Sequence, residues 1–337
     1  MIFHRPLPSR IINHLSLPSQ PVKAEVGTDI EKAAEILEKG GLVAIPTETV
    51  YGLAANALDP DAVLKIFEAK NRPSFDPLII HISNFEQLND LAQSFPLEAK
   101  ELMHEFWPGP LTVVMPKKII VPDLVTSGLG SVGIRMPAHP LALKLLSLLP
   151  FPLAAPSANP FGYISPTTAQ HVADQLGNKV DYILDGGPSK VGVESTIVSF
   201  ESEVPRILRW GGLDLEQIEP FLENFESSQQ SSDNPVAPGM LSSHYAPRKR
   251  LILGNLDELI EIHGKKDSSY LSFRKSYDMP GETLSESGDL SEAARNLFAA
   301  MRRLDAAEGN CILAERVPEK GLGRAINDRL KRAAHQV

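Results

Sequence analysis

The spacing of apolar positions switches repeatedly along this chain between the helical period and short continuous runs. Residues 28–41, TDIEKAAEILEKGG, place their apolar residues at helical spacing, with Thr28 and Glu31 at the spacing of a capping box and two glycines as a stop. The next residues, LVAIP, form a short apolar run that is typical of a buried strand. The chain therefore begins, from residue 25 onwards, as an α/β protein.

The same patterns predict the other elements up to residue 210. Helices are expected at 59–70, 95–107, around 140–149 and 168–176. Short strands are expected at 77–82, 111–116, 132–137, 152–156, 181–187, 195–200 and 205–210. So many strands separated by so few helices favour a twisted mixed sheet over strict βαβ winding.

A polar, nearly aperiodic stretch, FESSQQSSDNPVAP (225–238), has the composition of a linker. Beyond it, strand-like and helical segments alternate up to residue 335. This alternation predicts a small Rossmann-like parallel α/β domain. We therefore divide the chain into an N-terminal extension (1–24), a catalytic domain with a mixed sheet (25–215), a linker or lid (216–247) and the small C-terminal domain (248–337).

Composition narrows the possible partners. Of 337 residues, 42% are hydrophobic and 22% charged, as in ordinary globular proteins. No apolar run reaches the length of a membrane-spanning helix, so we expect a soluble protein without membrane contact. The formal net charge of −9 argues against bulk electrostatic binding of nucleic acid. Any anion site must therefore consist of a few placed cations and backbone amides.

Two further features bear on the cellular compartment in which the protein is expected. The single cysteine, Cys311, excludes an internal disulfide and a multi-cysteine zinc site, and its apolar surroundings predict a core residue. The first two dozen residues lack acids and carry Arg5 and Arg10, as a transit peptide would. Their prolines would break a long amphipathic helix, however, and no apolar signal region is present. We expect a plain extension and a cytoplasmic protein.

Hydroxyl groups and cations recur where predicted strands and helices end. Thr47 and Thr49 follow a buried strand, where α/β proteins bind ligands, although threonines also satisfy turn backbone. Lys70 and Arg72 flank one residue at a helix end. There they either offset the helix dipole or grasp phosphates. His81, inside an apolar strand, is most simply a core histidine bonded to backbone.

Arg135 is harder to explain structurally, because it lies in an apolar strand and an unpaired buried charge is costly. No acid is near it in sequence, so its partner is either a ligand carboxylate or phosphate, or a distant acid. Further neutral donors and one more cation follow other strands: Ser157, Asn159, Ser195, Thr196 and Arg209. Each is a weak signal alone, but together they indicate a site built of cations and neutral donors.

Missing motifs restrict the reaction. The sequence contains no G-x-x-x-x-G-K-[ST] phosphate loop, no H-E-x-x-H and no G-x-S-x-G elbow. A site of cations and neutral donors suits nucleotidyl transfer, in which the enzyme mainly positions reactants and stabilises charge.

Six ordered motifs resemble the YrdC-type catalytic domain of threonylcarbamoyl-AMP synthases: PTETVYGL, KNRPSFDPLIIHI, FWPGPLTVV, VGIRMP, APSANPFGYISPT and DGGPSKVGVESTIV. APGMLSSHYAPRKRL resembles the linker of the long, two-domain form of that family, and GLGRAINDRLKRAA the end of its second domain. The resemblance implies a nucleotidyltransferase that converts L-threonine, bicarbonate and ATP into L-threonylcarbamoyl-AMP and pyrophosphate. The product would feed N6-threonylcarbamoylation of a tRNA adenosine through a separate downstream transferase, with at most a weak tRNA contact by this chain.

Carried over by motif, the resemblance assigns the ATP phosphates and the catalytic role to Lys70 and Arg72. It assigns threonine to four positions, with the carboxylate on Arg135: Thr49, His81, Arg135 and Ala155. Other nucleotide-binding positions are Asp76, Ser131, Ser157, Asn159, Ser165, Ser195, Arg209 and Tyr245.

Tyr245 and Asp76 differ in kind from the other assigned residues. Tyr245, with His244, should fold back over the nucleotide as a lid. Asp76 stands where many relatives have Asn, His or Lys, and an acid cannot donate to phosphate, so its role is structural or through a metal. Mg²⁺ is expected with ATP, held mainly by the ATP phosphates and not by a protein metal site.

Three other classes of protein fit the sequence less well. A nucleic-acid-binding module is disfavoured by the acidic composition and the lack of interleaved aromatic and basic residues. Hydrogenase-maturation proteins that transfer carbamoyl groups contain a similar domain, but they also carry zinc-finger cysteines, which one cysteine excludes. A purely structural protein would leave the cations at strand ends without a purpose.

Overall fold

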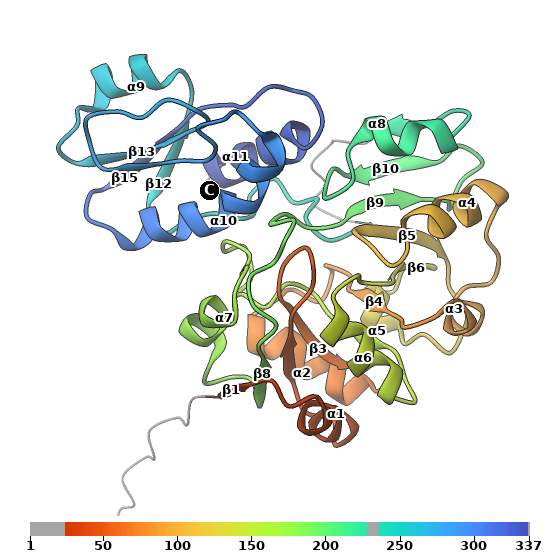
Figure 1. The fold of residues 1–337 in the computed structure, drawn as a ribbon. Helices are drawn as coiled ribbons and strands as arrows, with labels where there is room; N and C mark the ends of the chain where they lie inside the picture. Colours follow the sequence, from red (N-terminus) through yellow and green to blue (C-terminus); the bar gives the residue numbers. More distant parts are fainter. Residues whose placement is uncertain (1–23, 228–235, 336–337) are drawn as a thin grey trace, which may run out of the picture.

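The structure is a computed structural model that describes residues 24–227 and 236–335. Most of the predicted N-terminal extension and the centre of the predicted linker lie outside the described residues, so the domain limits stay predictions. Within the described residues, the strands form two separate sheets, one large and one small (Figure 1).

The large sheet is mixed, as predicted. It has the order β1-β8-β2-β3-β7-β4-β6-β5-β9-β10-β11 and contains both parallel pairs such as β4–β6 and antiparallel pairs such as β5–β6. Its strands are β1 (Glu25–Gly27), β2 (Val43–Ile45), β3 (Gly52–Asn56), β4 (Ile79–His81), β5 (Leu111–Pro116), β6 (Ser131–Arg135), β7 (Leu153–Ala154), β8 (Tyr182–Leu184), β9 (Thr196–Ser199), β10 (Arg206–Arg209) and β11 (Glu226–Ser227).

The predicted helices are present, with shorter ones in addition: α1 (Ile30–Glu38), α2 (Pro60–Lys70), α3 (Phe85–Leu91), α4 (Leu97–Phe106), α5 (Asp123–Thr126), α6 (Pro140–Leu148), α7 (Ala169–Leu176), α8 (Leu215–Ile218) and the 3₁₀ turn Glu219–Phe221. The predicted cap of α1 was wrong. Asp29, not Thr28, caps this helix, and its side chain accepts from the N–H of Lys32. Asp ranks above Thr as an N-cap residue, so the helix begins one residue later than the capping box suggests.

The small sheet is fully parallel, with the order β12-β15-β13-β14, which confirms the Rossmann-like prediction. Its elements are β12 (Arg250–Leu253), α9 (Leu256–His263), β13 (Ser268–Ser272), β14 (Gly281–Thr283), α10 (Leu290–Ala306), β15 (Cys311–Ala314) and α11 (Gly323–Ala334). Cys311 is half-buried at the edge of the cluster under α9, so the prediction of a core cysteine was wrong.

The two faces of the small sheet bury different helices because side chains alternate along each strand. Tyr270 and Leu313 pack with residues of α9, whereas their neighbours Leu271 and Ile312 belong to the cluster that contains α10 and α11. Figure 1 shows α9 on one side of this sheet and α10 on the other.

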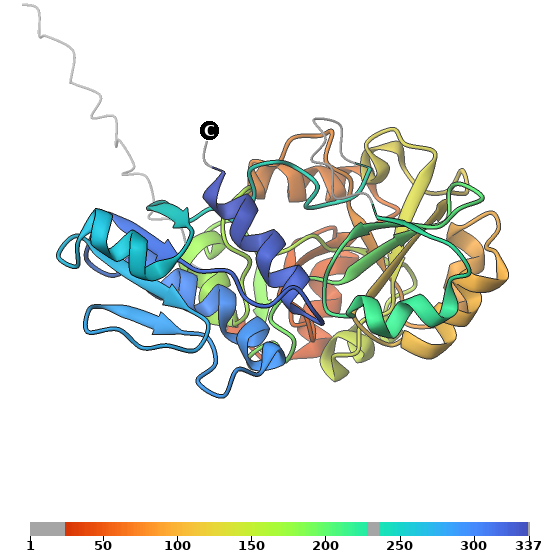
Figure 2. The ribbon, with the colours of Figure 1, turned by 90° about the horizontal axis from the view of Figure 1, so that it is seen from above.

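Helices α10 and α11 join the small sheet to the large one. Arg302 on α10 donates to the carbonyls of Ile164 and Ser165, and Arg324 on α11 forms an ion pair with Glu216 at 2.7 Å. One hydrophobic cluster runs through both parts, and Figure 2 shows α11 along their junction. No helix in the described residues is both long and apolar enough to span a membrane.

Candidate active site

A small cavity of about 50 Å³ lies where several strands of the large sheet end next to the linker segment 238–245. The structure brings many of the predicted site residues together in its wall. These are Thr47, Thr49, Arg72, His81, Arg135, Ala155, Ser157, Ser195, Arg209, His244 and Tyr245. Side chains from segments up to almost 200 residues apart therefore converge on one place.

Six other predicted residues do not line this cavity. One of them, Thr196, is buried, and its hydroxyl donates to the carbonyl of Leu213. Ser131 lines a separate, smaller cavity, and Ser165 lies behind the wall, where its hydroxyl donates to Glu194 at 2.5 Å. Lys70, Asp76 and Asn159 are buried directly beside lining residues. Their contacts explain how they bear on the site.

Lys70 lies at the last position of α2, which ends at Asn71 in the left-handed conformation (φ 52°). Its ammonium group is buried and donates to the carbonyls of Ser157 and Asn159, both at 2.5 Å. Burial, and then the charge of Arg72, lowers the pKa of Lys70 well below its ordinary value. Lys70 thus fastens the end of α2 to the loop that carries Ser157.

Arg72 and Asp76 form a buried ion pair, with 2.9 Å between Arg72 Nη2 and Asp76 Oδ2. Arg72 also donates to the carbonyls of Asp76 and Pro77, so the guanidinium has one orientation. Burial raises the pKa of Asp76, and the positive charges of Arg72, Lys70 and Arg209 oppose that rise. Asp76 therefore has a structural partner: it balances cations that would otherwise repel one another.

Arg135 is paired with a distant acid, which is one of the two partners that the sequence allowed. Its Nη2 lies 2.5 Å from Oε1 of Glu48, and Nε donates to the carbonyl of Gly109. Glu48 is held in turn by the N–H of Ala138. The ion pair does not enclose Arg135, which still lines the cavity.

His81 is bonded to backbone, as expected of a core histidine, and also lies in the wall of the cavity, as the resemblance implies. Its Nδ1 lies 3.2 Å from the carbonyl of Ile79, as in a core histidine, and the residue also lines the cavity. Burial, and then the charge of Arg135, lowers the pKa of His81 to about 3. The imidazole is therefore neutral near pH 7 and can only act as a neutral donor or acceptor.

Arg209 at the end of β10 is oriented by three contacts. Nε and Nη2 donate to the carbonyl and hydroxyl of Ser195, and Nη1 donates to the carbonyl of Pro238 in the linker. Ser195 Oγ lies 2.7 Å from Oγ1 of Thr112. The linker is therefore tied to a cation of the site.

Tyr245 brings the linker across the site. The residue has a positive φ of 60° and is 1% exposed. Its ring stacks on Phe298 of α10, with 5.6 Å between centroids, and the guanidinium of Arg329 lies 5.2 Å from its centroid. Burial lowers the pKa of the neighbouring His244, and the nearby cations Arg72, Lys70 and Arg209 lower it further. The linker thus places two aromatic rings beside the cation cluster.

Sequence reasoning missed three charged residues. Glu48 pairs with Arg135, and Glu194 lines the cavity and accepts from Ser165 and Arg329. Arg329 on α11 is fully buried and also donates to the carbonyl of Trp210. One signal was available: Arg329 lies at helical spacing from the buried Ile326 and Ala333, so it is on the apolar face of its helix.

Comparisons with known proteins agree with this architecture. The family model described as telomere recombination (Sua5, YciO and YrdC) matches residues 35–211, and the model described as threonylcarbamoyl-AMP synthase, C-terminal domain, matches residues 213–335. The threonylcarbamoyl-AMP synthase of Pyrococcus abyssi is 47% identical, over 90% of this chain and 94% of its own. That of Bacillus subtilis is 42% identical, over 90% of this chain and 92% of its own.

Solved structures extend the likeness to the whole fold. The crystal structure of P. abyssi Sua5 complexed with L-threonine has a TM-score of 0.87 and 45% identity, over 90% of this chain and 94% of that one. The fold and the site place the chain among YrdC-like α/β nucleotidyltransferases. Within that class, it belongs to the threonylcarbamoyl-AMP synthase family.

Proposed function

We propose that the cavity binds ATP and L-threonine side by side, and that the chain forms L-threonylcarbamoyl-AMP and pyrophosphate from these substrates and bicarbonate. The observation that carries this proposal is the convergence of guanidinium groups with neutral donors on one cavity. The P. abyssi relative, solved with L-threonine, supports the amino-acid half of the proposal.

We assign the amino acid to the wall formed by Thr49, His81, Arg135 and Ala155. Arg135 is oriented by Glu48 and Gly109, so its guanidinium can meet a carboxylate without further ordering. The neutral imidazole of His81 and the hydroxyl of Thr49 suit the polar groups of threonine. Ala155 is small and leaves room for its methyl group.

We assign the triphosphate to the wall that contains Arg72 and Arg209, with Lys70, Ser157 and Asn159 next to it. Ser131, Ser165 and Ser195 are proposed to complete the nucleotide site. A cavity of about 50 Å³ is far smaller than the roughly 300 Å³ or more of ordinary ligand sites. The linker segment with Tyr245 must therefore move for ATP to enter, which supports its role as a lid.

Mg²⁺ is proposed to accompany ATP. Within the described part of the chain, no cluster of three or more His, Cys, Asp or Glu residues could hold a metal ion, so the phosphates would supply most of its ligands. Two buried oxygens beside the cations, Asp76 Oδ1 and Asn159 Oδ1, accept no hydrogen bond and are of the type that Mg²⁺ prefers. When bound, Mg²⁺ would offset charge on the phosphates.

The proposed chemistry needs positioning more than proton transfer. The threonine amine adds to the carbon derived from bicarbonate and loses water to give a carbamate. A carbamate oxygen then bonds to the α-phosphorus, while the bond from that phosphorus to the bridging oxygen breaks and pyrophosphate leaves. Arg72 and Lys70 stabilise the negative charge on the leaving group, and Tyr245 excludes water from the site.

Pyrophosphate release tests the proposal. We expect release to require ATP, L-threonine and bicarbonate together, and Lys70→Ala to abolish it. Lys65→Ala, which removes an exposed lysine from the same helix, serves as the matched control and should keep wild-type turnover. Unchanged turnover in Lys70→Ala, or full release without threonine, would show that the assignment is wrong.

The product is proposed to pass to a separate tRNA threonylcarbamoyl transferase in the cytoplasm. The net charge of −9 supports at most a weak tRNA contact by this chain. Filter binding with tRNA, with and without ATP, tests that contact. Tight retention of tRNA at physiological salt would favour a nucleic-acid-binding function instead.

A further inference from the structure

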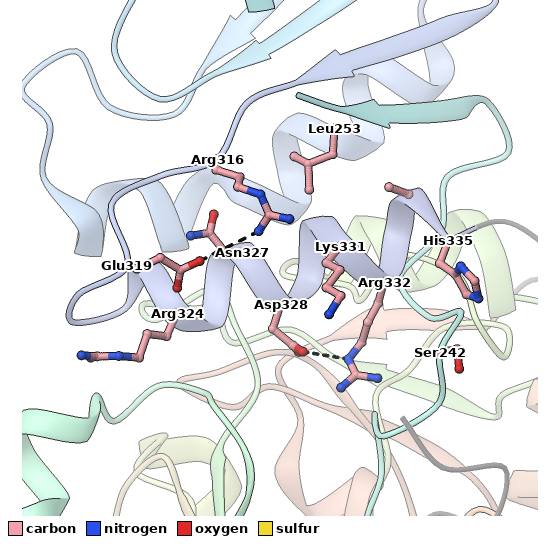
Figure 3. Close-up of a pocket in the computed structure, with 11 residues that line it drawn as sticks. Ser242, Leu253, Arg316, Glu319, Arg324, Asn327, Asp328, Lys331, Arg332 and His335 are labelled. Carbon is pink, nitrogen blue, oxygen red and sulfur yellow. Dashed lines mark hydrogen bonds and ion pairs between the residues drawn. The ribbon is translucent and has the colours of Figure 1, made fainter. Parts of the chain in front are cut away.

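A second and much larger cavity, of about 500 Å³, lies between α11 and the end of strand β12. We name it the C-terminal cleft. Figure 3 shows its lining residues: Ser242, Leu253, Arg316, Glu319, Arg324, Asn327, Asp328, Lys331, Arg332, Ala334 and His335. It shares no lining residue with the candidate active site. Its size is that of an ordinary small-molecule site.

The topology of the small sheet makes this place a natural ligand site. Strands β12 and β15 are parallel neighbours. The chain leaves β12 toward α9 on one face of the sheet and leaves β15 toward α11 on the other. Parallel sheets bind ligands at the carboxyl ends of two such strands, where the connections diverge. Leu253 ends β12 and Arg316 follows β15, and both line the cleft.

The charge of the cleft is predominantly positive. It carries four permanent cations against two carboxylates, within a chain whose net charge is −9. Arg324 forms an ion pair with Glu216, and Arg332 forms one with Asp328. Among the described residues, Arg316 pairs only with Glu319, which is 3.9 Å away and more than half exposed, and Lys331 makes no hydrogen bond or ion pair. Two cations therefore remain available to a ligand.

We propose that the C-terminal cleft is a second ligand site, which binds a phosphate-bearing small molecule of mononucleotide size through Arg316 and Lys331. Arg and Lys are the side chains that recognise phosphate most effectively. Leu253 and Ala334 supply an apolar surface for a base or another flat group, and Glu319 can accept from hydroxyls. A macromolecular polyanion fits less well, because the cations line a concavity and not an extended stripe.

Variants can address this cleft without loosening the active site. Arg332 and Asp328 are unsuitable, because Arg332 also donates to the carbonyl of Leu241 in the linker and Asp328 contacts Arg329. Arg316 and Lys331 are exposed, and among the described residues neither forms a hydrogen bond or ion pair with the linker or with a residue that lines the candidate active site. Lys265 and Lys266 are exposed lysines elsewhere in the same part of the chain, so Lys265→Glu/Lys266→Glu changes the net charge equally and is the matched control.

The test measures binding of radiolabelled ADP to the full chain by equilibrium dialysis. We expect Arg316→Glu/Lys331→Glu to remove one ADP site per chain. Affinity at that site should weaken at least about 100-fold, because removing each charge-assisted hydrogen bond to phosphate weakens binding about tenfold or more. The control variant should retain that site. The thermal midpoint of each unliganded variant verifies folding.

Competition identifies the recognised group. Inorganic tripolyphosphate should displace ADP from the site that Arg316→Glu/Lys331→Glu removes, and adenosine should not. If the charge-reversal variant binds ADP with wild-type stoichiometry and affinity, or if adenosine alone displaces the ligand, the proposal is wrong. Neither result bears on pyrophosphate release by the wild-type chain, so the two proposals fail independently.

Discussion

Replacing Arg329 by methionine would test how far the C-terminal helix supports the candidate active site. Arg329 is 0% exposed and contacts Glu194 and Asp328, each at 3.0 Å, and the carbonyl of Trp210 at 2.7 Å. Burial opposes its charge, but Tyr245, Glu194 and Asp328 outweigh burial and raise the pKa of Arg329. Methionine keeps much of the volume and removes the charge and every hydrogen bond.

The magnitude follows from the loss of one partner of a buried ion pair. Two unit charges about 4 Å apart attract by about 4 kcal/mol at an effective dielectric constant of about 20. Removing one partner of such a pair generally costs about 3–5 kcal/mol, because the other charge stays buried. Among the described residues, the Glu194 carboxylate would then keep a hydrogen bond only from the hydroxyl of Ser165. We expect the free energy of unfolding to fall by about 3–5 kcal/mol, and kcat for pyrophosphate release to fall because Glu194 and Tyr245 lose their support.

Chemical denaturation measures this free energy, and a double-mutant cycle with Glu194→Gln isolates the pair. We expect a coupling energy of about 0.5–3 kcal/mol. The matched control is Arg303→Met on α10, which breaks a largely exposed ion pair with Glu282 on β14 and should cost less than about 1 kcal/mol. A loss in Arg329→Met as small as in this control would refute the argument that the buried charge holds the two parts together.

Three further changes test the wall of the active site. Glu48→Gln should raise KM for L-threonine about tenfold, with a smaller change in KM for ATP, because the Arg135 guanidinium loses the charge that orients it. His81 binds a proton below about pH 6.5 in the unfolded chain but only below about pH 3 in the folded chain. The free energy of unfolding should therefore fall by about 1.4 kcal/mol per pH unit as the pH decreases from about 6.5 to about 3. His81→Asn should reduce that slope in denaturation curves. Gly239→Ala should sharply reduce pyrophosphate release, because the new Cβ would lie 2.6 Å from Oη of Tyr245.

Each of these has a contradicting outcome. Equal changes in both KM values would mean that Glu48 does not act through Arg135. An identical pH slope in wild type and His81→Asn would mean that this histidine is not buried in its neutral form. For Gly239→Ala, the control is Gly264→Ala, which has a similar positive φ (74° against 83°) but nothing within 4 Å of the added Cβ. Equal losses in both variants would point to backbone strain and not to displacement of the lid.

Sequence patterns predicted most elements because helices and buried strands have local signatures. Strand β3 (Gly52–Asn56) was not predicted, because its residues GLAAN show neither alternation of apolar and polar positions nor a β-branched run. It forms only because β2 and β7 flank it in the sheet. The cap of α1 lies one residue later than predicted because the capping-box spacing favours Thr28, whereas Asp29 is the better cap by residue type.

For the site, the sequence alone indicated the residue types and the strand ends that carry them, and the resemblance named the chemistry. Which charges pair could not be predicted, because Glu48 lies 87 residues from Arg135 and Glu194 lies 135 residues from Arg329. A charge buried on an apolar face has to find an opposite charge, but its partner depends on which segments the sheet order brings together.

What the sequence by itself determined is therefore local: an α/β chain, its helices and most of its strands, and a set of cations and hydroxyls where those elements end. The tertiary structure alone decided that Arg72, Arg135 and Arg209 share one cavity, that Tyr245 crosses it, and that α11 supports it through Arg329. The physical reason is that hydrogen bonding and periodicity act over a few residues, whereas burial of charge is settled only when distant segments pack together.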